Sequence, residues 1–127
     1  MTAPWPRARK SDSNWTLGHV TVGGARSFSN APAIADASTR LSFLELHERT
    51  LGLASQLAKL GVRRSDRVLL WATKHVECVI AMFAIARLGA TFVPIDPAVP
   101  PERLEFLLQD VEARAFVGRL PLVTDDA

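Results

Sequence analysis

The sequence predicts an α/β fold with a partial parallel sheet and flanking helices. Short apolar segments that are typical of buried strands alternate with longer segments whose apolar residues recur at helical spacing. Glycines stand where two of the predicted helices end, at Gly61 and Gly89. Because such alternation favours crossovers between parallel strands, we expect the strands to run in one direction.

Size and composition indicate one ordinary globular domain. The chain has 127 residues, of which 48% are hydrophobic and 22% charged, and its net charge of +2 gives no indication of a nucleic-acid partner. The single cysteine, Cys78, cannot form an internal disulfide. The first residues lack the pattern of an export signal, and no apolar run approaches the roughly 20 residues that span a bilayer. We therefore expect a cytoplasmic protein without a membrane span.

Three segments are expected along the chain. Residues 1–30 mix Pro, Gly, Ser and basic residues without a sustained period, apart from the apolar run Leu17 to Val22, and predict a flexible leader. Residues 31–120 carry the folded domain, and residues 121–127 form a tail.

The domain begins with a predicted hairpin and a long helix. Apolar runs at 33–37 and 41–43 flank a polar turn, which favours two short strands. Ser42 and Glu45 then have the spacing of a capping box that starts a helix. Gly61 ends this helix, and its expected core stripe comprises Leu46, Leu53, Leu57 and Leu60.

The remaining elements follow in the order strand, helix, strand, helix, strand. The strands are predicted at 68–71, 90–95 and 115–117, and Pro94 indicates the end of the second strand or an edge of the sheet. The helix at 75–88 is apolar around most of its circumference, so we expect it to be buried nearly all round. After the turn at Asp96 and Pro97, Pro101 begins the last helix, whose buried stripe is expected at Leu104, Leu107, Leu108 and Val111.

Three short parallel strands cannot cover both faces and both edges of a sheet. The apolar helix at 75–88 also has few partners within this chain. We therefore expect further polypeptide, from the same protein or from another, to cover the sheet.

The search for chemistry yields no catalytic, cofactor-binding or metal-binding residue. Gly23 and Gly24 are not followed by the glycine and lysine of a phosphate loop. The three histidines show no metal-ligand spacing. His75 and Cys78 are three residues apart on one predicted helix, but the apolar neighbours of Cys78 favour a structural role.

Four segments in order resemble the adenylate-forming (AMP-binding) superfamily, which includes acyl-CoA synthetases, luciferases and the adenylation domains of nonribosomal peptide synthetases. Residues 41–46 (LSFLEL) resemble its first core motif, and residues 86–97 (ARLGATFVPIDP) resemble the second. Between them, residues 58–62 (AKLGV) and 66–68 (DRV) look like the family's connecting block, and residues 101–104 (PERL) continue in register. One departure is Ser65, which stands where the family usually has glycine.

The resemblance implies that this chain is the first βαβαβ part of the large N-terminal domain of an adenylate-forming enzyme. The matched positions are expected to be scaffold and not catalytic: Ser42, Glu45, Gly61, Asp66, Gly89, Pro94, Asp96 and Pro97.

The implied activity is activation of a carboxylic acid with ATP as an acyl-adenylate, followed by transfer to a thiol, as in acyl-CoA synthetases. ATP, Mg²⁺ and CoA, or the phosphopantetheine of a carrier protein, are implied for the complete enzyme. The family's phosphate loop and catalytic lysine follow later in the chain than Val117, so we expect this chain to bind no cofactor and to be inactive alone.

Three alternatives remain open. The chain could belong to an amino-acid adenylation domain of a peptide synthetase. It could also be a non-catalytic docking module whose partner is the missing remainder of a synthetase, or the remnant of an interrupted gene.

Overall fold

The structure is a computed structural model that describes residues 17–118. Its centre is a three-stranded sheet of order β4-β3-β5 in which both neighbouring pairs are parallel. The predicted strand–helix alternation is therefore confirmed. The elements of this part are β3 (Arg67–Trp71), α3 (Val76–Arg87), β4 (Thr91–Ile95), α4 (Pro101–Asp110) and β5 (Ala115–Val117).

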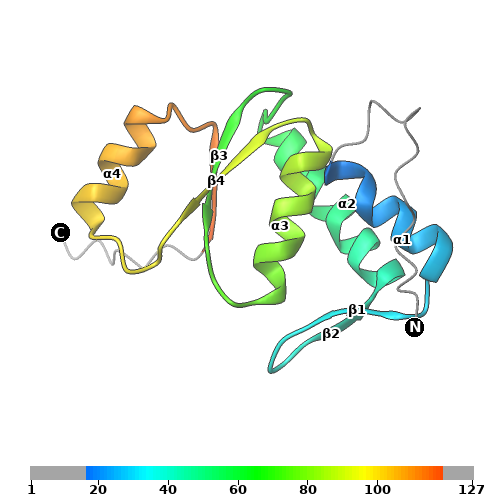
Figure 1. Cartoon of the computed structure of the whole chain (residues 1–127). Coiled ribbons are helices and arrows are strands. Elements are labelled where there is room, and N and C mark those ends of the chain that lie inside the picture. Colours follow the sequence, from blue (N-terminus) through cyan, green and yellow to red (C-terminus); the bar gives the residue numbers. More distant parts are fainter. Residues whose placement is uncertain (1–16, 119–127) are drawn as a thin grey trace, which may run out of the picture.

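The helices cover the two faces of the sheet from opposite sides. In Figure 1, α4 lies on one side of the strands, and α3 lies on the other with α2 (Phe43–Lys59) packed beside it. Consecutive residues of β3 pack on opposite faces of the sheet, because side chains alternate along a strand. Val68 joins a core cluster with residues of α2 and α3, whereas Leu69 packs with Leu104 of α4, and both strand residues are fully buried.

A hairpin precedes α2, as predicted. Strands β1 (Pro32–Ala35) and β2 (Arg40–Ser42) pair antiparallel. The capping box is also confirmed: the Glu45 N–H donates to Ser42 Oγ over 3.1 Å, and the Ser42 N–H donates to Glu45 Oε1 over 3.0 Å. The cap fixes the point at which the chain leaves the hairpin and enters α2.

The predicted core stripe of α2 is wrong at its last residue. Leu46 and Leu57 are buried and Leu53 is half-buried, but Leu60 is 69% exposed. The helix ends at Lys59, so Leu60 is the cap residue and no longer follows the helical face. The buried positions between Leu46 and Leu57 are Thr50 and Ala54.

The predicted leader is wrong from residue 17 onward. Residues Leu17–His19 form a 3-10 helix, η1, and Val20–Phe28 form helix α1, which packs against α2. The pair of glycines in α1 disfavours a helix locally, but a methyl group on Gly24 would clash with the Phe43 ring. Glycine thus permits close packing on α2. The rest of the predicted leader, residues 1–16, and the tail 121–127 lie outside the described residues.

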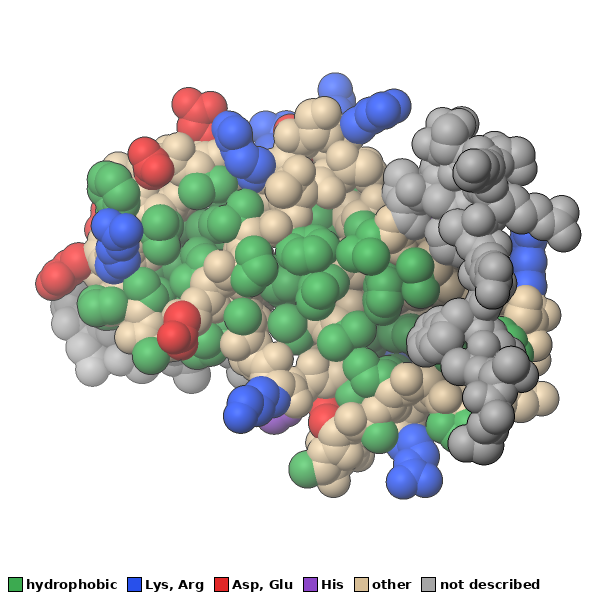
Figure 2. Space-filling view, viewed as in Figure 1, with side chains coloured by type: hydrophobic (Ala, Val, Ile, Leu, Met, Phe, Trp, Pro, Cys, Tyr) green, Lys and Arg blue, Asp and Glu red, His purple; other side chains and the backbone are tan. Residues whose placement is uncertain are grey.

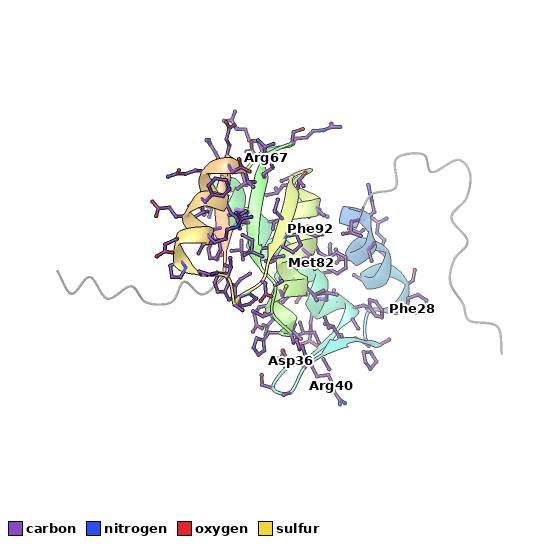
Figure 3. The ribbon with its side chains drawn as sticks, turned by 60° about the vertical axis from the view of Figure 1, so that its left-hand side comes forward. Phe28, Asp36, Arg40, Arg67, Met82 and Phe92 are labelled. Carbon is purple, nitrogen blue, oxygen red and sulfur yellow. The ribbon has the colours of Figure 1, made fainter. Side chains whose placement is uncertain are left out.

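Helix α3 is buried on one side and half-covered on the other. Val76, Ile80, Ala81, Ala84 and Ile85 are buried, whereas its other apolar side chains are partly exposed, so the expectation of burial nearly all round is met in part. Figure 2 shows apolar side chains gathered over the middle of the molecule in this view, and Figure 3 labels Met82 on α3 and Phe92 on β4.

None of the helices within residues 17–118 combines the length and the apolar character that crossing a membrane requires.

Candidate functional site

A cleft of about 590 Å³ opens at the carboxyl ends of β3 and β5, beside the first turn of α3. Its walls combine apolar side chains, such as Leu70 and Val117, with polar ones, such as Thr73 and His75. Ligands of open α/β sheets bind at the carboxyl ends of the strands. This cleft is therefore the candidate site in the described part of the chain.

Asp36, which lies in the turn of the hairpin, caps the amino end of α3. Its Oδ2 accepts the Val76 N–H over 2.9 Å, although the two residues are 40 positions apart. Its Oδ1 accepts the backbone N–H groups of Ser38 and Thr39, each over 2.8 Å. Asp36 therefore acts as an N-cap supplied by a different element of the fold.

These bonds determine the charge of the carboxyl group. The Val76 N–H has the largest effect, followed by the Ser38 N–H, and together with the Thr39 N–H they lower the pKa of Asp36 from 3.8 to about 2. A negative charge is thus already present where the positive end of α3 would otherwise attract an anion.

Helices α2 and α4 also carry a carboxylate in their first turn. Glu45 bonds to the start of α2, and Glu102 lies in the first turn of α4 behind Pro101, which has no N–H to offer. A phosphate group would meet a carboxylate at each of these three helix ends.

His75 and Cys78 do not form a catalytic pair in this arrangement. The Cys78 N–H donates to the His75 carbonyl oxygen over 3.1 Å, which is an ordinary bond of a helix turn. The His75 imidazole Nδ1 lies 3.9 Å from Asp36 Oδ2, so the ring is drawn toward the hairpin. Between residues 17 and 118, no group of three or more His, Cys, Asp or Glu side chains is placed to hold a metal ion.

The predicted motif positions lie at the ends of elements and not in the cleft. Gly61 and Gly89 have φ angles of 94° and 70° and end α2 and α3. Asp66 Oδ2 accepts the Arg63 N–H over 2.8 Å within the loop before β3. At the opposite end of the sheet, Asp96 Oδ1 accepts the Ala98 N–H over 2.9 Å in the turn after β4.

Two side-chain contacts between different elements were not predicted from the sequence. Asp36 caps α3, and the buried hydroxyl of Thr21 lies 3.1 Å from His47 Nδ1, which links α1 to α2. An Asp placed two residues before a serine in a polar turn is a recognisable signal of a side chain that bonds to its own turn. No local signal identifies the partner of Thr21.

The described residues form an open α/β unit with a cleft at the carboxyl ends of its strands, and comparison with known families makes its class specific. The sequence model of the family described as "AMP-binding enzyme" matches residues 23–127. The chain belongs to this family. The match begins inside α1, which agrees with the structured segment found there.

Two curated relatives illustrate the relationship. Enterobactin synthase component F of Shigella flexneri is 33% identical over 113 residues, which are 87% of this chain and 9% of that protein. The L-proline--[L-prolyl-carrier protein] ligase of Pseudomonas fluorescens is 41% identical over 81 residues, which are 64% of this chain and 16% of that protein. The chain thus spans a small part of the length of the relatives that it matches.

A solved structure, the complex of VinN with 3-methylaspartate, superposes with a TM-score of 0.77 at 21% identity. The match covers 83% of this chain and 29% of that one. Its likeness shows the fold, which is that of the N-terminal domain of adenylate-forming enzymes.

Proposed function

We propose that this chain is the opening part of an adenylation domain that activates an amino acid with ATP and passes it to the thiol of a carrier protein. The supporting observation is the 41% identity to a ligase whose name states that it joins L-proline to a carrier protein. This relationship favours the peptide-synthetase alternative over an acyl-CoA synthetase.

The described residues contribute scaffold to this activity. They form the first three parallel strands, hold α3 through Asp36, and end α2 and α3 at Gly61 and Gly89. Because the amino ends of α2, α3 and α4 carry carboxylates, we expect the phosphates of ATP to be bound by residues outside this part. We expect no catalysis by the chain alone.

The proposal can be tested by fusing this chain to the remaining part of a related ligase. The chain is fused to the part of the Pseudomonas fluorescens ligase that follows its match, and exchange of labelled pyrophosphate into ATP is measured with each of a panel of amino acids. We expect amino-acid-dependent exchange by the fusion and none by the chain alone. A soluble, folded fusion without exchange would contradict the proposal, as would exchange by the isolated chain.

The thiol acceptor is tested separately. Product transfer to a carrier protein with phosphopantetheine is compared with transfer to free CoA. Transfer to CoA alone would favour an acyl-CoA synthetase and contradict the amino-acid adenylation proposal.

A further inference from the structure

Helix α1 has few local features that stabilise a helix. In Figure 1 it packs beside α2, on the side away from the strands. Its nine residues include two glycines, Gly23 and Gly24, and the β-branched run Val20, Thr21 and Val22. A helix of this length is marginal in water by itself. The helical state of α1 therefore depends on its contacts with the rest of the chain.

Three contacts join α1 to α2. Gly24 lies so close to the Phe43 ring that a methyl group there would clash, and the centroid of the Phe28 ring is 6.0 Å from that of Phe43. The hydroxyl oxygen of Thr21 lies 3.1 Å from His47 Nδ1. Thr21 is the fully buried residue of α1, with 2% exposure. A polar contact in this interface thus involves a titratable side chain.

Charged groups act on His47 from the three helices around it. Burial has the largest effect in lowering the pKa of His47, followed by Arg87 of α3. Arg26 of α1 lowers the pKa further, and Glu48 of α2 has the opposite effect. The interface therefore favours the neutral imidazole. A proton on His47 would be held in a half-buried position near two arginines.

Separation of α1 from α2 would remove two of these effects. Arg26 would move away with α1, and water would reach the imidazole on the side that α1 covers. Arg87 and Glu48, whose charges are opposite, would stay with α3 and α2. The open form therefore binds a proton more readily than the closed form. The closed form is favoured above about pH 6.5 and loses this advantage as the pH falls, so acid shifts the population toward the open form.

We propose that protonation of His47 separates α1 from α2 in a local opening, while the sheet and helices α2 to α4 stay folded. Within residues 17–118, none of the three apolar core clusters contains a residue of α1. Segments with few buried apolar contacts open at a lower free energy than the whole domain. The proposal goes beyond the proposed function and does not depend on it.

The test is hydrogen exchange of the full chain in its native state, measured at single amides from pH 7.5 to pH 5.5. Each rate is divided by the intrinsic rate at the same pH, which gives the opening equilibrium. The amides of Gly24 to Phe28 report on α1, and the amide of Leu69 reports on the sheet. We expect α1 to open at least about tenfold more readily than the sheet, and its opening to increase about threefold or more as the pH falls.

Low concentrations of urea distinguish a local opening from unfolding of the domain. Opening of α1 exposes little surface, so its exchange should depend only weakly on urea. Exchange at Leu69 requires unfolding of the sheet and should increase steeply with urea.

The matched substitutions are His47→Gln and His75→Gln. The amide introduced by His47→Gln can still bond to Thr21 but does not titrate, so the pH response of α1 should disappear. His75 Nδ1 lies 3.9 Å from Asp36 Oδ2 beside the hairpin, so His75→Gln should retain the response. The NMR signals of the His47 imidazole in the natural chain require no substitution, and they should titrate over the pH range in which α1 opens.

Four results would overturn the proposal. Opening of α1 that does not change with pH in the natural chain would do so, as would an equal pH response in His47→Gln. Exchange of α1 with the protection and the urea dependence of Leu69 would show that α1 separates only when the whole domain unfolds. Loss of the response in His75→Gln would assign it to the hairpin instead of the α1–α2 interface.

Discussion

Ser65 donates its backbone N–H to the carbonyl oxygen of Gly89 over 3.0 Å, and both residues have a φ of 70°. The bond joins the loop after α2 to the turn after α3, at the amino end of the sheet. Two residues with left-handed backbone conformations thus fix the direction in which the chain enters β3 and β4. Only one of them is glycine, and Ser65 is the position at which the family resemblance leads us to expect glycine.

Ser65→Gly should stabilise the protein. A left-handed conformation costs a residue with a side chain about 1–2 kcal/mol, and the greater freedom of glycine in the unfolded chain offsets about 0.4–1 kcal/mol of the gain. We expect the free energy of unfolding to rise by about 0.5 kcal/mol in urea denaturation. Ser55→Gly, on the exposed side of α2, is the control and should lower it. A loss of stability in Ser65→Gly would show that the serine hydroxyl matters more than the backbone.

Gly89→Ala should destabilise the protein by about 1–2 kcal/mol. Its φ of 70° disfavours a side chain, and an added Cβ would lie 3.1 Å from Arg64 Cγ. Gly52→Ala is the matched control, because Gly52 lies in α2 with nothing within 4 Å of an added Cβ. It should stabilise the protein by about 0.5–1 kcal/mol. Equal effects of the two substitutions in chemical denaturation would contradict the role of Gly89.

Asp36→Asn should lower the melting temperature at pH 7 by about 5 °C, since an amide can replace only one of the two acceptor oxygens that bond to Val76, Ser38 and Thr39. The pKa of Asp36 is lowered from 3.8 to about 2, so the native state binds this proton less readily than the unfolded state. The stabilisation is therefore present above about pH 4 and is lost as the pH falls toward 2.

The measurement is thermal unfolding of both proteins from pH 7 to pH 2, in which the difference in melting temperature should shrink below pH 4. Ser38→Ala removes only the hydroxyl that lies 3.3 Å from Asp36 Oδ1, so it should have a smaller effect. A constant difference at all pH values would contradict the assigned charge.

His47 should make stability depend on pH near neutrality. Burial has the largest effect in lowering its pKa from 6.5, followed by the positive charge of Arg87. The native state therefore favours the neutral imidazole, and stability should fall as the pH decreases below 6.5. His47→Gln should remove this slope between pH 7.5 and about pH 5.5 in urea denaturation. Thr21→Val removes the partner but leaves the imidazole, so it should cost about 1 kcal/mol at pH 7.5 and keep the slope.

The sequence predicted the parts of the fold whose signals are local. The capping box at Ser42 and Glu45 and the helix-ending glycines Gly61 and Gly89 involve residues within a few positions of one another. Buried strands and helical stripes likewise have short periods. These signals suffice for the order of elements and for a parallel sheet.

The wrong and missing predictions concern features whose structure depends on contacts between residues far apart in the sequence. Helix α1 contains two glycines and has no favourable local pattern, and its packing depends on Phe43 and on the bond between Thr21 and His47. The predicted core stripe includes Leu60 because its helical spacing continues one residue past the end of α2 at Lys59. The cap from Asp36 to α3 joins residues 40 positions apart, and the cleft beside it is built from several elements.

Pro94 also limits how copies of this sheet can associate. If strands join only at β5, each molecule has a single point of attachment, and two molecules that meet there leave no further site for a third. Growth into a filament needs two attachment points on every unit. With one backbone donor fewer at the outer edge of β4, Pro94 weakens the second attachment point and so disfavours such growth.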